Sequence, residues 1–230
     1  YTGQTSTITA FNNTTKTLTM NPVTNDQSYY SPRQGNTYFL SGVLEALDVA
    51  SEWYMDATHL YLWAPSGGVP ANVEAKTRQT AFNLKGKSYI TISGIRTMAA
   101  NILMATVGST PSTNNVLDKV KAEYLYFSDY SHGTSIESQR ERGINMVGDY
   151  NELKNSTIAY STGTLVHIAG KGNRVVNNSI HDGSFMATHD SLIRLSSGTE
   201  NVIDHNEIRD SGRGLLSIYG GSGVISYNDM

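Results

Sequence analysis

The 230-residue chain contains no cysteine, and this absence excludes several classes of protein. Without a thiol, the chain cannot form a disulfide scaffold, a Cys-ligated zinc site or a cysteine nucleophile. Its length is sufficient to bury a hydrophobic core without such a covalent or metal link. We therefore expect packing and hydrogen bonds to hold the fold.

An excess of charge of one sign is also lacking. The 17 Lys and Arg residues and 20 Asp and Glu residues give a net charge of −3, which is too balanced for electrostatic binding of nucleic acid. No apolar run reaches the roughly 18 to 20 residues that span a bilayer. We expect neither a nucleic-acid nor a membrane partner. Because Tyr1 is not an initiator, we expect a piece of a longer, secreted or cell-surface protein.

Helix-forming residues are scarce, and short alternating apolar segments between Asn, Gly and Ser indicate β-strands. An internal repeat is the most informative feature. Segments 151–158, 173–180 and 201–208 align with one another, and 223–230 matches more loosely. Their closing apolar residues, Ile158, Ile180, Ile208 and Met230, are 22, 28 and 22 positions apart.

A second short strand precedes each unit, at 144–146, 166–168, 193–195 and 216–218, and 82–84 begins the series. Each is apolar, polar, apolar, so the outer side chains face inward and the middle one faces outward. A unit of about 22 residues buries its apolar side only against copies of itself. We predict an all-β fold, a right-handed single-stranded parallel β-helix over 77–230 that is truncated at its C-terminus; a β-sandwich is the alternative.

The corners and the first third of the chain complete the predicted architecture. Asn155 and Asn177 suit a left-handed turn and can stack their amides, and His205 takes a corner Asn position with a structural hydrogen bond. Residues 1–76 are expected to form a β-rich cap on the open end of the solenoid, with Trp53 and Trp63 plugging its interior.

Residues 77–230 resemble the pectate-lyase-like right-handed β-helix superfamily. Segment 188–195 is similar to the acidic turn that carries catalytic Asp in polygalacturonase-like glycoside hydrolases, although His189 precedes a single Asp190 here. Segments 36–40, 51–56 and 60–65 are similar to the N-terminal region of bacterial β-helix carbohydrate enzymes. The resemblance implies a carbohydrate-active protein with a polysaccharide or oligosaccharide partner.

Stacked coils lie ~4.8 Å apart, so equivalent positions form columns. The predicted outward column is Asn145, His167, Arg194 and Ser217, and the column four residues earlier is Glu141, Gly163, Asp190 and Arg213. Glu141 and Asp190 are then ~9.6 Å apart, which suits an inverting glycosidase. Asp182 and Asp210 form a competing pair ~5 Å apart, which suits a retaining mechanism or a pair of turn residues.

Two connections between coils are longer than the rest, and both leave the same side of the predicted solenoid. Ile158 to Val166 spans eight residues, whereas Ile180 to Ile193 spans 13 and Leu125 to Ile144 spans 19. Insertions on one face of a repeat protein commonly build its binding surface. The predicted catalytic residues are Asp190, Glu141 and Asp182, and the predicted substrate-binding residues are His167, Arg194, His189, Phe185, Asp210 and Arg213.

The sequence favours a glycoside hydrolase with paired carboxyl groups, no cofactor and no metal site. A polysaccharide lyase is the second hypothesis, with Arg or Ca²⁺ neutralising a uronate carboxylate. A non-catalytic adhesin, spike or glycan-binding scaffold is the third, because a fold does not determine chemistry.

Overall fold

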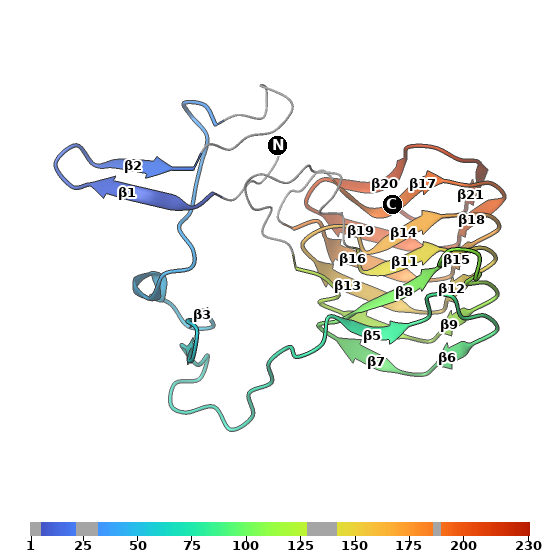
Figure 1. Cartoon of the computed structure of the whole chain (residues 1–230), viewed down its shortest axis with the longest axis horizontal. Helices are drawn as coiled ribbons and strands as arrows, with labels where there is room; N and C mark the ends of the chain where they lie inside the picture. The colour runs from blue at the N-terminus through green and yellow to red at the C-terminus, as the bar shows by residue number, and fades with distance from the viewer. Residues whose placement is uncertain (1–5, 22–31, 128–141, 186–189) are drawn as a thin grey trace. The chain divides into compact units, whose positions relative to one another are not determined.

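The computed structural model describes residues 6–21, 32–127, 142–185 and 190–230. The chain divides into two compact units. One comprises Tyr1–Ser31 and Lys76–Met230, and the other comprises Pro32–Ala75. The larger unit contains a solenoid of parallel strands that ascends from β5 to β21 (Figure 1).

Three parallel sheets, here called sheets I, II and III, form the walls of the solenoid in the described residues. Sheet I contains β5 (Thr80–Asn83), β8 (Asn101–Ala105), β11 (Ile144–Val147), β14 (Val166–Ala169), β17 (Ser191–Ser197) and β20 (Gly214–Ile218). Sheet II contains β6 (Thr91–Ser93), β9 (Val116–Asp118), β12 (Glu152–Lys154), β15 (Arg174–Val176), β18 (Asn201–Asp204) and β21 (Gly223–Ser226). Sheet III contains β7 (Arg96–Met98), β10 (Lys121–Glu123), β13 (Thr157–Ser161), β16 (Ser179–Gly183) and β19 (Glu207–Ser211). The chain visits the sheets in the order I, II, III, so each coil stacks on the one before it.

The register of sheet I confirms the predicted inward and outward positions. Val166 pairs with Ile144 and Ile193, and Ile193 pairs with Leu216 in turn. The outward column runs through Asn145, His167, Arg194 and Ser217, as the sequence predicts. The inward residues Ile144, Val166 and Ile193 are fully buried. They belong to one continuous core cluster that draws on all three walls and excludes water from the interior.

The corners are built on aligned residues with positive φ. At the corner between sheets II and III these are Gly94, Lys119, Asn155, Asn177, His205 and Tyr227, with φ between 49° and 66°. A second column at the corner between sheets I and II contains Tyr89, Asn114, Tyr150, Gly172 and Glu200, and a third at the end of sheet III contains Ala99, Tyr124, Tyr160, Asp182 and Asp210. A single left-handed residue turns the chain sharply, so the strands stay short and the corners stay in register. The prediction of left-handed Asn155 and Asn177 is confirmed.

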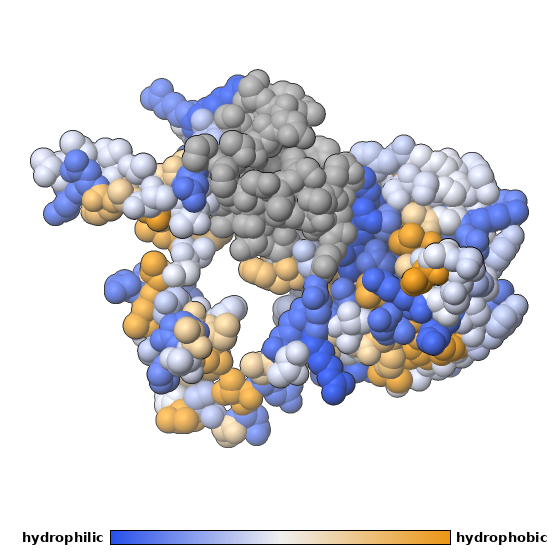
Figure 2. Space-filling model, in the orientation of Figure 1, coloured by the Kyte–Doolittle hydropathy of each residue, from blue (hydrophilic) through white to orange (hydrophobic). Residues whose placement is uncertain are grey.

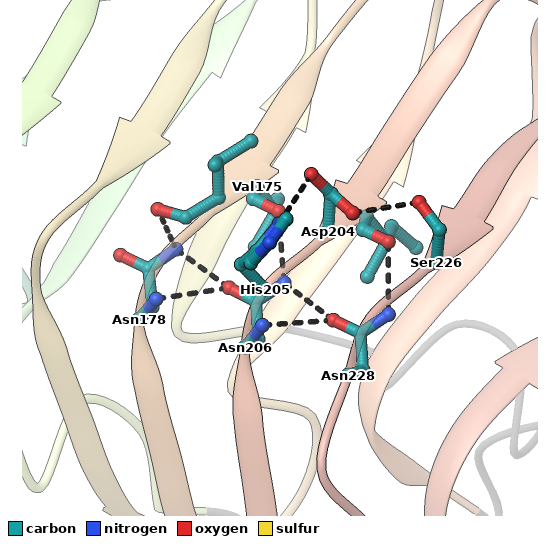
Figure 3. A network of polar contacts seen from close by, with 9 residues as sticks. Val175, Asn178, Asp204, His205, Asn206, Ser226 and Asn228 are labelled. Carbon is teal, nitrogen blue, oxygen red and sulfur yellow. Dashed lines mark hydrogen bonds and ion pairs between the residues drawn. The ribbon is translucent and has the colours of Figure 1, made fainter.

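Buried asparagine side chains link consecutive coils at two corners. Asn206 accepts from the backbone N–H of Asn178 at 3.0 Å and donates to the carbonyl of Val175 at 2.9 Å (Figure 3). Asn228 continues this series, in which the side chain of each Asn binds the Asn of the neighbouring coil, and we call such a series a ladder. An equivalent ladder at the corner between sheets I and II consists of Asn115, Asn151, Asn173 and Asn201. These amides satisfy backbone groups that the turns leave without a strand partner. At the surface, Asn177 donates to Asn155 at 2.7 Å, so the predicted amide stacking also occurs there.

The remaining described elements are two antiparallel hairpins and a 3-10 helix, which do not belong to the three parallel sheets. β1 (Ile8–Asn12) and β2 (Thr17–Met20) form an antiparallel hairpin. The smaller unit contains the short 3-10 helix η2 (Leu44–Ala46) and a second hairpin of β3 (Trp53–Met55) and β4 (Leu60–Leu62). Hydrophobic residues lie on the surface of this unit (Figure 2). Trp53 is 63% and Trp63 47% exposed, and their role as a plug of the solenoid, like the cap itself, stays a prediction.

The described residues include no helix of the length and hydrophobicity needed to cross a membrane.

Candidate functional site

The outward face of sheet I, beside the corner that follows sheet III, is the candidate site. The two long connections both leave sheet III and enter sheet I, after β10 and after β16. The short connection from β13 to β14 lies on the coil between them, as the loop lengths predict. Glu141 and His189 lie outside the described residues.

Asp190 and Arg194 form a buried ion pair at this corner. Arg194 Nη1 lies 3.7 Å from Asp190 Oδ1, and the two side chains are 5% and 6% exposed. Arg194 points outward from β17, and the ring of Tyr219 covers its guanidinium group, with 4.0 Å between Cζ and the ring centroid. The carboxylate and the aromatic face together stabilise a cation that is almost removed from water.

His167 lies beside Arg194 on the neighbouring strand and is 4% exposed. Its Nδ1 lies 3.2 Å from Asn145 Oδ1, and its Nε2 lies 2.7 Å from Ser196 Oγ. The guanidinium group of Arg142 contacts both ring nitrogens and lies 2.6 Å from Nε2. A bulge between Ile168 and Ala169 displaces the register, which allows Ser196 to reach the imidazole.

The register also brings together the predicted residues of the turn into sheet I. Ser191 pairs with Gly214, so Asp190 and Arg213 precede paired positions on adjacent coils. Gly163 precedes the pair of Val166 and Ile193 by three residues, as Asp190 does, so it occupies the position predicted for it. Arg213 is exposed, in contrast to Arg194. Phe185 is 54% exposed and follows β16 at the start of the insertion.

Asp182 and Asp210 lie on neighbouring coils, as predicted, but on sheet III rather than on the outward face of sheet I. The residues on either side of Asp182 pair with those on either side of Asp210. Both have positive φ, and their side chains are 42% and 58% exposed. Asp182 binds the Nδ1 of His181 at 2.7 Å, and Asp210 binds Arg209 at 2.5 Å. Each carboxylate thus binds the residue just before it in the sequence, as expected of a residue with a structural role in a turn.

Sequence interpretation missed Arg142, Ser196 and Tyr219. Tyr219 follows Ser217 by two residues and is the next outward position, so the period of two contained its signal. Arg142 precedes the inward Ile144 by two, so the same period assigns it inward and gave no signal of its contact with the outward His167. Ser196 follows the outward Arg194 by two residues and so had the same signal, although the bulge that follows Leu195 was not predictable.

Among the described residues, no three His, Asp or Glu side chains gather as ligands of a metal ion would.

A family model described as the right handed beta helix region matches residues 100–230. The match covers more than half of the chain, which therefore belongs to this family, and the predicted right-handed β-helix is confirmed. The fold is common in polysaccharide-active enzymes. The comparisons found no match among curated proteins and none among solved structures.

Proposed function

We propose that the chain is a carbohydrate-active enzyme that hydrolyses a polysaccharide or its side chains on the outward face of sheet I. The observation that carries this proposal is the convergence of Asp190, Arg194 and His167 beside the corner from which both insertions arise. Polar side chains that are nearly removed from water, beside a corner where the connections are longest, are typical of a site rather than of a solvated wall.

Asp190 supplies one of the two carboxyl groups that glycoside hydrolysis requires. Its ion pair with Arg194 fixes the carboxylate, which then accepts a proton from the attacking water. Glu141, which lies outside the described residues, is the proposed acid partner, because the sequence repeat predicts ~9.6 Å between it and Asp190 along the stack, a separation that fits inversion. Asp182 is the alternative partner. His167 and Arg194 orient sugar hydroxyls by hydrogen bonding.

The test is release of reducing ends from a panel of plant and algal glycans. Asp190→Asn is expected to lower kcat on the active glycan by about 10³-fold or more, because it removes a group that acts in the transition state. Asp118→Asn is the matched control, since this carboxylate lies on sheet II and accepts from Asn155. Full activity of the Asp190→Asn protein would remove Asp190 from the mechanism.

A polysaccharide lyase is the second candidate, and the basic character of the same face favours it. Arg142, His167 and Arg194 lie on this face together with one described carboxylate, Asp190. A lyase needs a cation to neutralise a uronate carboxylate and a base to remove the adjacent proton. Appearance of a UV-absorbing unsaturated product would decide for the lyase, and its loss with a chelator would indicate Ca²⁺.

The partner and location follow from the same proposal. A polysaccharide substrate places the protein outside the cytoplasm, in the periplasm, at the cell surface or in the medium. Fractionation of the native host with an antibody against the chain tests this location. Absence of any cleaved glycan in the panel, with retained glycan binding, would instead support the non-catalytic scaffold.

A further inference from the structure

An open pocket of about 380 Å³ lies at the corner between sheets II and III. This corner is distinct from the one between sheets III and I that carries the insertions. The pocket is lined by Asn155, Ser156, Asn177, Asn178, Ser179, His205 and Glu207. These residues belong to three successive coils, so the pocket extends along the solenoid axis over ~9.6 Å.

Corner residues form one wall of this pocket. Asn155, Asn177 and His205 follow one another in the left-handed column, and the next member is Tyr227. The imidazole of His205 stacks on the Tyr227 ring with 5.0 Å between centroids and an interplanar angle of 29°. The His205 side chain is 59% exposed and Tyr227 is 80% exposed. The corner thus offers amides and an aromatic pair to the solvent.

A hydrogen bond to the preceding residue, Asp204, fixes the orientation of the His205 ring. Its Nδ1 lies 2.7 Å from Asp204 Oδ2, while Ser226 donates to Asp204 Oδ1 at 2.6 Å (Figure 3). The hydrogen bond from Ser226 and then that from His205 lower the pKa of Asp204. A fixed carboxylate that accepts from Nδ1 holds the ring in one orientation, as the carboxylate partners of functional histidines do.

Glu207 forms part of the lining on the side of sheet III. Ser179 donates to Glu207 Oε2 at 2.9 Å, and Arg209 Nε donates to Oε1 at 2.9 Å. The Ser179 bond and then the Arg209 bond lower the pKa of Glu207, so the carboxylate is ionised near neutral pH. Half of this side chain remains exposed, with lone pairs available to a hydroxyl donor.

We propose that this pocket is a second glycan-binding site, which takes a neutral oligosaccharide segment along the solenoid axis. Amide groups and a fixed carboxylate match the paired donors and acceptors of sugar hydroxyls, and the stacked rings of His205 and Tyr227 offer an apolar face to a sugar ring. No Lys or Arg lines the pocket. Arg209, which binds Glu207, is also paired with Asp210, so an acidic sugar gains no unpaired cation there.

The proposal does not depend on the cleavage proposed above. A second contact at another corner would hold a polymer while the face of sheet I engages a different segment of it, and linked contacts raise avidity without new chemistry at either site.

Isothermal titration with neutral cello-, xylo-, malto- and mannohexaose, and with acidic hexagalacturonate, tests the proposal. The Asp190→Asn chain serves as the parent, so that binding is read without turnover. His205→Asn is the decisive variant, because Asn already occupies the two preceding corner positions at the same φ. Glu207→Gln is the second variant. Tyr89→Asn removes an exposed aromatic from a different left-handed column and is the matched control.

We expect at least one neutral probe to bind, with affinity lowered about tenfold or more by His205→Asn and by Glu207→Gln. The Tyr89→Asn control should bind as the parent does. Unchanged affinity in both pocket variants, binding of the acidic probe alone, or no binding of any neutral probe would overturn the proposal. Cleavage assays on the chain with Asp190 intact report separately on the face of sheet I.

Discussion

The ring of Tyr219 covers the guanidinium group of Arg194 at 4.0 Å, although 25 residues separate the two in the sequence. Asp190 approaches the same guanidinium group at 3.7 Å. The cation thus has an aromatic face and a carboxylate as neighbours, and both limit the orientations open to it. Tyr219 is in this sense a positioning residue for the candidate site.

Replacing Tyr219 should lower the activity, because the ring no longer holds the guanidinium group of Arg194 in place. Tyr219→Leu removes a cation–π contact worth about 1 kcal/mol, so we expect kcat/KM on the active glycan to fall about fivefold. Tyr219→Phe keeps the ring and should restore the activity. Steady-state kinetics resolve the effect into kcat and KM, and thermal unfolding measures stability. Equal losses in the Leu and Phe variants would show that the ring does not position Arg194.

The buried amide of Asn206 should contribute strongly to stability. Asn206→Ala leaves the N–H of Asn178 and the carbonyl of Val175 buried without their side-chain partner. Each such group costs about 1–3 kcal/mol, so we expect the free energy of unfolding in urea to fall by roughly 2–4 kcal/mol. The exposed Asn155→Gly is the control. Its lost hydrogen bonds are replaced by water, and Gly accepts its φ of 52°. A comparable loss in both variants would contradict a special role for the buried ladder.

Lys119 offers a stabilising substitution. It is exposed and has a φ of 53°, between Gly94 and Asn155 in the same left-handed column. A side chain such as Lys pays about 1–2 kcal/mol in this conformation, whereas Asn tolerates it better. We expect Lys119→Asn to raise the free energy of unfolding by about 0.5–1 kcal/mol. Asn177→Val places a β-branched residue at a φ of 57° and should lower the free energy of unfolding. Urea midpoints measure both, and a destabilised Lys119→Asn protein would refute the strain argument.

Glu123 should make stability depend on pH. Burial raises the pKa of its carboxyl group, but hydrogen bonds and charges from Lys121 and Arg96 outweigh burial, and the net pKa is lowered. A carboxyl whose folded pKa is depressed stabilises the protein fully above its unfolded pKa of about 4.5, and this contribution is lost as the pH falls through the folded pKa. The stability advantage of the parent over Glu123→Gln should therefore be present at pH 7 and shrink below pH 4.5. Unfolding in urea across this range measures it.

An advantage of the parent over Glu123→Gln that stays constant down to pH 3 would contradict this linkage. The Arg96→Met variant supplies the matching control. It removes the ion pair at 2.8 Å but keeps the carboxyl group, so the pH at which stability declines should move upward.

Much of the solenoid was predictable because its signals are local. Segments such as 166–168 and 193–195 alternate between apolar and polar residues, and the alternation by itself assigns Ile168 inward and His167 outward. β8 was missed because Asn101–Ala105 lacks this clear alternation, with Ile102 and Met104 fully buried and Asn101 also buried. The surface stacking of Asn155 and Asn177 was expected, but the buried ladders were not, since a buried amide has no distinct pattern in one sequence.

The sequence by itself determined the coil length, the repetition of short strands and the side of the wall on which residues such as His167 and Ile168 lie, because these depend on neighbours a few positions away. Only the tertiary structure decided which polar side chains meet. Arg142 reaches His167 across one coil, and Ser196 does so through a bulge. Asp182, in contrast, lies on sheet III, where it binds its sequence neighbour His181. The contacts of His167 with the neighbouring coils depend on register shifts and turn conformations that accumulate over more than twenty residues, so no local pattern determines them.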